Sequence, residues 1–183
     1  MALAFDATSS GSVNPGTSLT YSHTCSGSNK ILLVGARGGT TDTITGITYA
    51  GVSMTLVDKK IQTGQTKCSY LFYLLNPAAG ANNIVVSASS SVTIGSEGVS
   101  LTGANQAAPE ASAVNGNENV NNITNTISTV TSNAWIVTHF SYGDNSDSFT
   151  VDNGQVLRAE THVNASDCIT TNGPIATPSS QAN

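Results

Sequence analysis

Runs in which apolar and polar residues alternate recur along the whole chain, and apolar spacing of helical period is nearly absent. In TSLTYSHTC (17–25), every second residue from Leu19 to Cys25 falls on one side, and hydroxyl residues fall on the other. Because successive side chains of a strand point to opposite faces, this run predicts a strand with one buried face. The run KILLVGA (30–36) is almost continuously apolar, which predicts a strand covered on both faces.

Further strand signals are separated by short turn sequences, at intervals typical of sandwiches and jelly rolls. They are ITGITYAGVSMTLV with a tight turn at Ala50–Gly51, KCSYLFYLLNP, IVVSAS, VTIGSEGVSLTGA, ITNTISTV, AWIVTHFSY, and FTVDNGQVLRAETHV as a short hairpin through Asn153–Gly154. The tail ASDCITTNGPIATPSSQAN is polar and predicts at most one short strand, around Ile169. We therefore expect one all-β domain over residues 1–183, an antiparallel, jelly-roll-like β-sandwich with about ten to twelve short strands.

The stretch NQAAPEASAVNGNENVNN (Asn105–Asn122) differs from the rest, because it has little apolar content and no periodicity. It predicts a long polar surface loop. Loops of this length inside a compact domain are usually functional or mobile.

Charged residues make up only 9% of the chain, against roughly 25% in ordinary soluble domains. Hydrophobic residues reach 38% and stand in discrete blocks, which favours a folded domain over a disordered one. The formal net charge is −5, and the six Lys and Arg residues are scattered. This distribution excludes nucleic acid as a partner and argues against attachment to a membrane surface, since both need clustered cations.

Three cysteines, Cys25, Cys68 and Cys168, occur without any C-x-x-C pair. An odd number and isolated positions favour buried free thiols. The first residues, MALAFDATSSGSV, contain neither a basic region nor a long apolar segment, and no later run is long enough to span a bilayer. We therefore expect synthesis in the cytoplasm without a signal peptide.

His23 and Cys25 raise the question of a metal site or of a nucleophile with its base. On a strand their Cβ atoms would lie roughly 6–7 Å apart on one face, which zinc could bridge only with two further ligands. The remaining candidate ligands are isolated in the sequence: His139, His162, Cys68 and Cys168. We favour a structural role, in which both side chains share the buried face and His23 is hydrogen-bonded and neutral.

The sequence also gives no support for the catalytic residues of a serine hydrolase or a glycosidase. No G-x-S-x-G is present, and the chain has so many serines that a Ser, His and Asp set carries no information. A glycosidase would need two facing carboxylates, and nothing pairs the available glutamates. These are Glu97, Glu110, Glu118 and Glu160. We expect no catalytic, cofactor-binding or metal-binding residue and no enzymatic activity.

The turn YGDNSDSF offers Asp144 and Asp147 to calcium but does not match the EF-hand pattern, so we interpret it as a solvated turn. Aromatic residues that could stack on a sugar are few. Trp135 heads an apolar run and is expected in the core, while Tyr49 and Tyr142 are weaker candidates near turns.

Four stretches, in this order, resemble a family of jelly-roll or β-sandwich domains in phage virion proteins (decoration and tail-fibre proteins) and bacterial surface proteins. They are GTSLTYSHTCSGSNKILLVGA, ITGITYAGVSMTLV, YLFYLLNPAAGANNIVVSAS and VSLTGANQAAPEASA, and the span they cover is about two-thirds of the chain. The resemblance implies a sandwich used in adhesion or virion architecture rather than catalysis, with SHTCSGSN as a scaffold element. Similar members close with a further apolar strand containing a tryptophan, which this sequence lacks. Either the sandwich closes differently or a neighbouring subunit covers that edge, and the need for some cover favours an obligate oligomer.

The hypothesis that follows is a bacteriophage virion structural protein, a capsid decoration (cement) protein that stabilises the head. It would act as a homotrimer on the major capsid protein at the capsid surface, through interface area and hydrogen bonds. The loop Asn105–Asn122 or the segment Met1–Val13 is expected to reach a neighbour. The alternative is a tail-fibre or surface adhesin module that binds host glycans, and a polysaccharide hydrolase is a third possibility.

Overall fold

The computed structural model describes residues 2–61, 67–116, 123–143, 149–151 and 154–182. Within these ranges twelve strands pair antiparallel in three hydrogen-bonded sheets, and no residue is helical. The expected all-β, antiparallel sandwich is therefore confirmed. The strands are β1 Ala4–Cys25, β2 Ile31–Gly38, β3 Ile44–Tyr49, β4 Val52–Ser53, β5 Thr55–Ile61, β6 Cys68–Leu75, β7 Gly80–Thr102, β8 Thr126–Ser128, β9 Ala134–Tyr142, β10 Val156–His162, β11 Ser166–Ile175 and β12 Ser180–Ala182.

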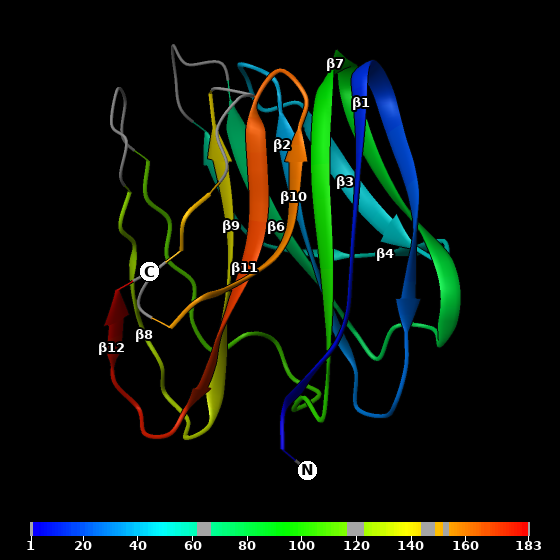
Figure 1. Cartoon of the computed structure of the whole chain (residues 1–183). Coiled ribbons are helices and arrows are strands. Elements are labelled where there is room, and N and C mark those ends of the chain that lie inside the picture. Colours follow the sequence, from blue (N-terminus) through cyan, green and yellow to red (C-terminus); the bar gives the residue numbers. More distant parts are fainter. Residues whose placement is uncertain (1, 62–66, 117–122, 144–148, 152–153, 183) are drawn as a thin grey trace.

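Two strands are much longer than the short strands that the sequence predicts. β1 and β7 pair along nearly their whole lengths, with register shifts around Val13, Gly16 and Ser18. Such irregularities bend a ribbon. The bend places the first half of β1 and the second half of β7 in one layer with β2, β6 and β5, and their other halves in a second layer with β3 and β4. One hydrogen-bonded sheet therefore forms two facing layers (Figure 1). We call these the middle layer and the β3 layer.

A hydrophobic core fills the space between these two layers. Leu19 and Ile84 from the β3 layer meet Val34 and Phe72 from the middle layer. Leu19, His23 and Cys25 are all buried, and the residues between them are exposed or partly exposed, so the predicted face of this strand is confirmed.

The third sheet, β10-β11-β9, covers the outer face of the middle layer (Figure 1). A second core forms there from Leu33, Val99 and Ile169. Every residue of β2 is buried, which agrees with the prediction of a strand covered on both faces. Arg158 of β10 also stacks over the Phe5 ring of β1, 4.1 Å from its centre.

The polar tail is where the sequence prediction was wrong. Instead of one short strand near Ile169, β11 runs for ten residues as the central strand of the third sheet, with Ser166–Asn172 buried. Its polar side chains have partners in neighbouring elements, as described below. The final strand β12 pairs with β8.

Three further expectations concern the long polar loop, the N-terminal segment and the hairpin predicted through Asn153–Gly154. Residues 105–116 form no helix or strand, and the rest of the predicted loop, 117–122, lies outside the described residues. Met1–Val13 is not a free arm: from Ala4 onward it is a strand paired with β7. Asn153 of the predicted hairpin is not described, and β10 pairs with the following strand β11 rather than with the preceding segment.

Candidate functional site

His23 lies between the β3 layer and the middle layer, 1% exposed, in a chain of hydrogen-bonded side chains. Its Nδ1 is 2.8 Å from Ser9 Oγ and its Nε2 is 3.1 Å from Ser100 Oγ. Ser100 in turn donates to the carboxylate of Asp6 at 2.7 Å. Burial lowers the pKa of His23 to about 4, against the opposite effect of Asp6, so the ring is neutral near pH 7.

These hydrogen bonds around His23 favour a structural role for the H-x-C spacing over a metal site or a nucleophile with its base. Cys25 is buried beside the core rather than joined with His23 in a site. Ser100, the group between histidine and carboxylate, is 0% exposed and lies where no substrate reaches it. The ring nitrogens of His23, which belongs to the β3 layer, are instead satisfied by Ser9 and Ser100 of the middle layer, as buried polar groups require.

A second polar network joins the middle layer to the third sheet. Arg37 on β2 contacts Asp167 on β11 at 2.6 Å, with side chains 1% and 0% exposed. Arg37 Nη2 also donates to the Val163 carbonyl at 2.8 Å. His139 Nε2 on β9 lies 3.1 Å from Glu97 Oε2 on β7, and these side chains too are 1% and 0% exposed.

Thr161 on β10 links the two acidic groups. Its hydroxyl lies 2.6 Å from Glu97 Oε1 and 3.4 Å from Asp167 Oδ2. Burial raises the pKa of Glu97 and the nearby Asp167 charge raises it further, while the His139 contact opposes both. The network fits because residue 95 is a glycine: a Cβ at this position would lie 2.2 Å from Asp167 Oδ2. Nothing in the local sequence could reveal these contacts, since the strands that meet are far apart along the chain.

The pair Glu97 and Asp167 is the nearest approach to the two carboxylates of a glycosidase. Both side chains are fully buried between layers, and such an enzyme needs them on either side of an open cleft. The arrangement therefore aligns two sheets and offers no surface for catalysis.

Ser69 connects this network to an internal space. Its Oγ is 2.8 Å from His139 Nδ1, so Ser69, His139 and Glu97 have the connectivity of a nucleophile, base and acid. However, Ser69 is the second residue of β6, paired with Arg37 on one side and Lys60 on the other. The backbone around it belongs to two strand ladders and offers no oxyanion hole, the largest contribution in acyl transfer.

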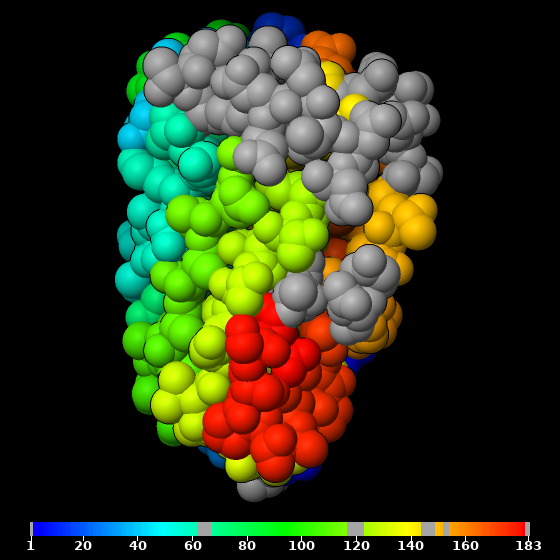
Figure 2. All heavy atoms as spheres, turned by 90° about the vertical axis from the view of Figure 1, so that its left-hand side faces the viewer, coloured from blue at the N-terminus to red at the C-terminus, as the bar shows by residue number. Residues whose placement is uncertain are grey.

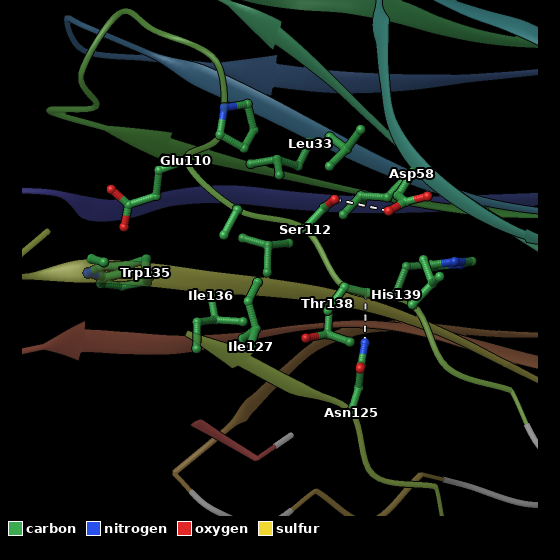
Figure 3. Close-up of a pocket in the computed structure, with 18 of the residues that line it drawn as sticks. Leu33, Asp58, Glu110, Ser112, Asn125, Ile127, Trp135, Ile136, Thr138 and His139 are labelled. Atoms are coloured by element: carbon green, nitrogen blue, oxygen red, sulfur yellow. Dashed lines mark hydrogen bonds between the residues drawn. The ribbon is translucent and has the colours of Figure 1, made fainter. Parts of the chain in front are cut away.

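The internal space is a cavity of about 480 Å³ beside β9, the edge strand of the third sheet. Its walls are the outer face of the middle layer (Leu33, Leu71), the edge of β9 and the segment 105–116, which we call the lid segment. Figure 3 shows Leu33 on one side and Ile127 on the other, with Trp135 and His139 toward opposite ends. In Figure 2 the lid segment forms part of the outer surface over this region. Volumes of this size are typical of small-molecule sites.

The other candidate residues do not assemble into a site. Tyr49 is 0% exposed and donates to backbone carbonyls, and Trp135 packs in the second core, as expected of a core tryptophan. Glu110 accepts hydrogen bonds from the backbone of residues 130 and 131, and Glu160 from that of Phe149. Glu118, Asp144 and Asp147 lie outside the described residues.

None of the three cysteines is in a disulfide and all three are buried, which confirms the prediction from their number and spacing. Burial raises the pKa of both the Cys25 and the Cys168 thiols. Within the described ranges, no three His, Cys, Asp or Glu side chains gather as a metal ion would require. In the same ranges no helix is long and apolar enough to cross a membrane.

No protein-family model, curated protein or solved structure matches this chain. The resemblance to phage virion and bacterial surface domains therefore stays a prediction from the four sequence stretches quoted above.

Proposed function

We propose that this chain is a bacteriophage virion structural protein, a capsid decoration protein that binds the major capsid protein through an extended surface. The observation that carries the proposal is the outer face of the β3 layer. The strand segments 16–25, 44–53 and 80–89 that build this layer contain no Asp, Glu, Lys or Arg. Their outward positions are mostly hydroxyl or amide residues: Ser18, Thr20, Ser22, Thr24, Thr45, Thr48, Ser53, Asn83, Val85 and Ser87.

Such a face suits a protein interface for two physical reasons. The cores of protein interfaces are depleted of charged residues, because a charge is costly to remove from water. Hydroxyl and amide groups can donate and accept, so they can be satisfied by a partner's polar groups as well as by water. In Figure 1 this layer forms one broad side of the molecule, away from β8 and β12.

The same geometry makes a catalytic role the weaker proposal, because the Arg37–Asp167 and His139–Glu97 pairs are sealed inside the sandwich. A glycan-binding module would need accessible aromatic rings, and Tyr49 and Trp135 are used within the fold. Phe5, the aromatic residue among the large exposed hydrophobics described, lies under Arg158.

The test measures binding to heads assembled from the major capsid protein encoded with this chain. Light scattering after size exclusion gives the oligomeric state, and we expect a trimer that co-sediments with the heads. Thr20→Lys places a charge in the outer face and should weaken binding at least tenfold. Thr126→Lys, an equally exposed change on β8, is the matched control and should bind as the unmodified protein does.

Absence of co-sedimentation at micromolar protein would overturn the decoration role. Equal binding by both lysine variants would leave a capsid role but remove the β3 layer as its surface. Binding to a glycan array in place of heads would favour the adhesin alternative.

A further inference from the structure

The cavity beside β9 exists because of the side chains that close it. Along the lid segment, Pro109, Ala111 and Ala113 are partly buried, and the residues between them are exposed. This alternation is that of an extended segment laid over the sheet. Its inward residues are small, so the cover does not fill the space above Leu33 and Leu71.

The lid segment is held in place by specific hydrogen bonds. Ser112 donates to Asp58 at 2.9 Å, and the Asn125 amide donates to the Ala113 carbonyl at 2.7 Å. Glu110 accepts from two backbone N–H groups, at 2.9 and 3.1 Å. Figure 3 shows the contacts of Ser112 and Asn125 on opposite sides of the segment. The cavity is therefore a built feature with a fixed cover.

The lining is chemically divided between two ends. Leu33, Leu71 and Ile127 give one region an apolar wall. Toward β5 and the start of β6 the lining becomes polar and includes Lys60 and Lys67. Of the six Lys and Arg residues in a chain of net charge −5, three border this cavity: Lys59, Lys60 and Lys67.

Lys60 is the distinctive group at the polar end. It is paired across the strands with Ser69, so the two side chains share the face that borders the cavity. Among the described residues Lys60 forms no salt bridge, and the nearby residues 62–66 (QTGQT) carry no charge. Lys67 donates to the Asn164 carbonyl at 3.0 Å, and the carboxylate at this end, Asp58, already accepts from Ser112 and from the Lys59 backbone.

We propose that this cavity binds an amphipathic anion, with an acyl chain between Leu33 and Leu71 and a carboxylate head group at Lys60. The ligand's acyl chain covers the apolar wall from water. The charge-assisted hydrogen bond between its carboxylate and Lys60 fixes the orientation of the ligand. This inference depends on the cavity alone and is independent of capsid binding, so either can fail without the other.

The test titrates the full chain with dodecanoate by calorimetry. We expect saturable binding at one site, with affinity rising about fourfold per methylene from octanoate to decanoate to dodecanoate. Dodecanol, which keeps the chain and lacks the charge, should bind about tenfold more weakly.

Two pairs of variants separate the head group from the chain. Lys60→Gln should weaken dodecanoate binding about tenfold and leave dodecanol binding unchanged. Lys59→Gln is the matched control: Lys59 also borders the cavity, but its ammonium is already paired with Asp42. Ala113→Leu should abolish binding by filling the space, while Val156→Leu, an exposed change outside the cavity lining, should not.

The melting temperature of each variant shows whether it is folded, since filling a cavity in a folded protein holds or raises stability. No saturable binding by the folded protein would overturn the proposal. Unchanged affinity in a folded Ala113→Leu variant would overturn the site. Equal effects of Lys60→Gln and Lys59→Gln would overturn the assignment of the head group.

Discussion

The buried, neutral His23 predicts how the stability of this protein depends on pH. Its ring accepts from Ser9 at Nδ1 and contacts Ser100 at Nε2, and burial lowers its pKa to about 4 from 6.5. Asp6 is the charged group at the end of this chain, and Tyr49 meets the ring edge-on at 6.3 Å. In the unfolded chain the ring is in water and has its ordinary pKa.

The sign and size follow from proton linkage. Above pH 6.5 the ring is neutral in both states, so protonation adds nothing to the free energy of unfolding. Between pH 6.5 and 4 only the unfolded chain takes up the proton, which favours unfolding, and below pH 4 the difference is constant. Lowering the pH from about 7 to about 5 should remove about 2 kcal/mol of stability, and the full loss below pH 4 should approach about 3 kcal/mol.

Urea unfolding of the protein and of His23→Gln, each at a series of pH values, measures this contribution. Other acidic groups titrate in both proteins, so their effects cancel in the difference. The difference in unfolding free energy should shrink by about 2 kcal/mol between about pH 7 and about pH 5. His162→Gln removes an exposed histidine and should stay within about 0.5 kcal/mol of the unmodified protein at each pH. Parallel curves for His23→Gln and the unmodified protein would refute the neutral, buried state of His23.

Three further results are expected from the fold itself. Asp167→Asn should cost about 3–5 kcal/mol in urea unfolding, because it leaves the Arg37 charge buried without a counter-charge; a loss under about 1 kcal/mol would show that water reaches the pair. Gly35→Ala should cost about 2 kcal/mol of unfolding free energy, since the added Cβ would lie 2.1 Å from the ring of His139. Gly46→Ala, with open space around it, should be nearly neutral. A thiol reagent should label none of the three buried cysteines in the native protein and all three in urea; fast native labelling would contradict their burial.

The sequence predicted those parts of the fold in which an apolar pattern reports burial directly. The period-two run ending at Cys25 and the continuous run of β2 face the cores that their patterns require. β11 could not be found in this way, because SDCITTNGPI is mostly polar. Its burial depends on partners in other elements, such as Gln155 for Thr170 at 2.6 Å and Arg37 for Asp167. Pattern analysis detects apolar burial and misses a polar strand whose hydrogen bonds are satisfied internally.

The cavity and the polar networks were beyond sequence reasoning for a different reason. Arg37 and Asp167 are 130 residues apart, and Lys60 comes opposite Ser69 only through the pairing of β5 with β6. The residues themselves are ordinary, and their meaning depends on strand order, which spacing does not determine. The lid segment did give a signal, a long stretch without periodicity. Small residues at every second position, Pro109, Ala111 and Ala113, are a further signal, which indicates an extended segment with one inward face.

The placement of charge links the fold to the proposed function. In a chain with only 9% charged residues, Arg37, Glu97 and Asp167 are fully buried between the middle layer and the third sheet, where they fix how the two layers align. The segments of the β3 layer, in contrast, contain no Asp, Glu, Lys or Arg. A surface of hydroxyl groups costs little free energy to remove from water, provided that the partner supplies hydrogen-bond donors and acceptors in place of the water. An interior aligned by charges and an outer β3 face free of them are together the properties expected of a rigid module that acts by contact.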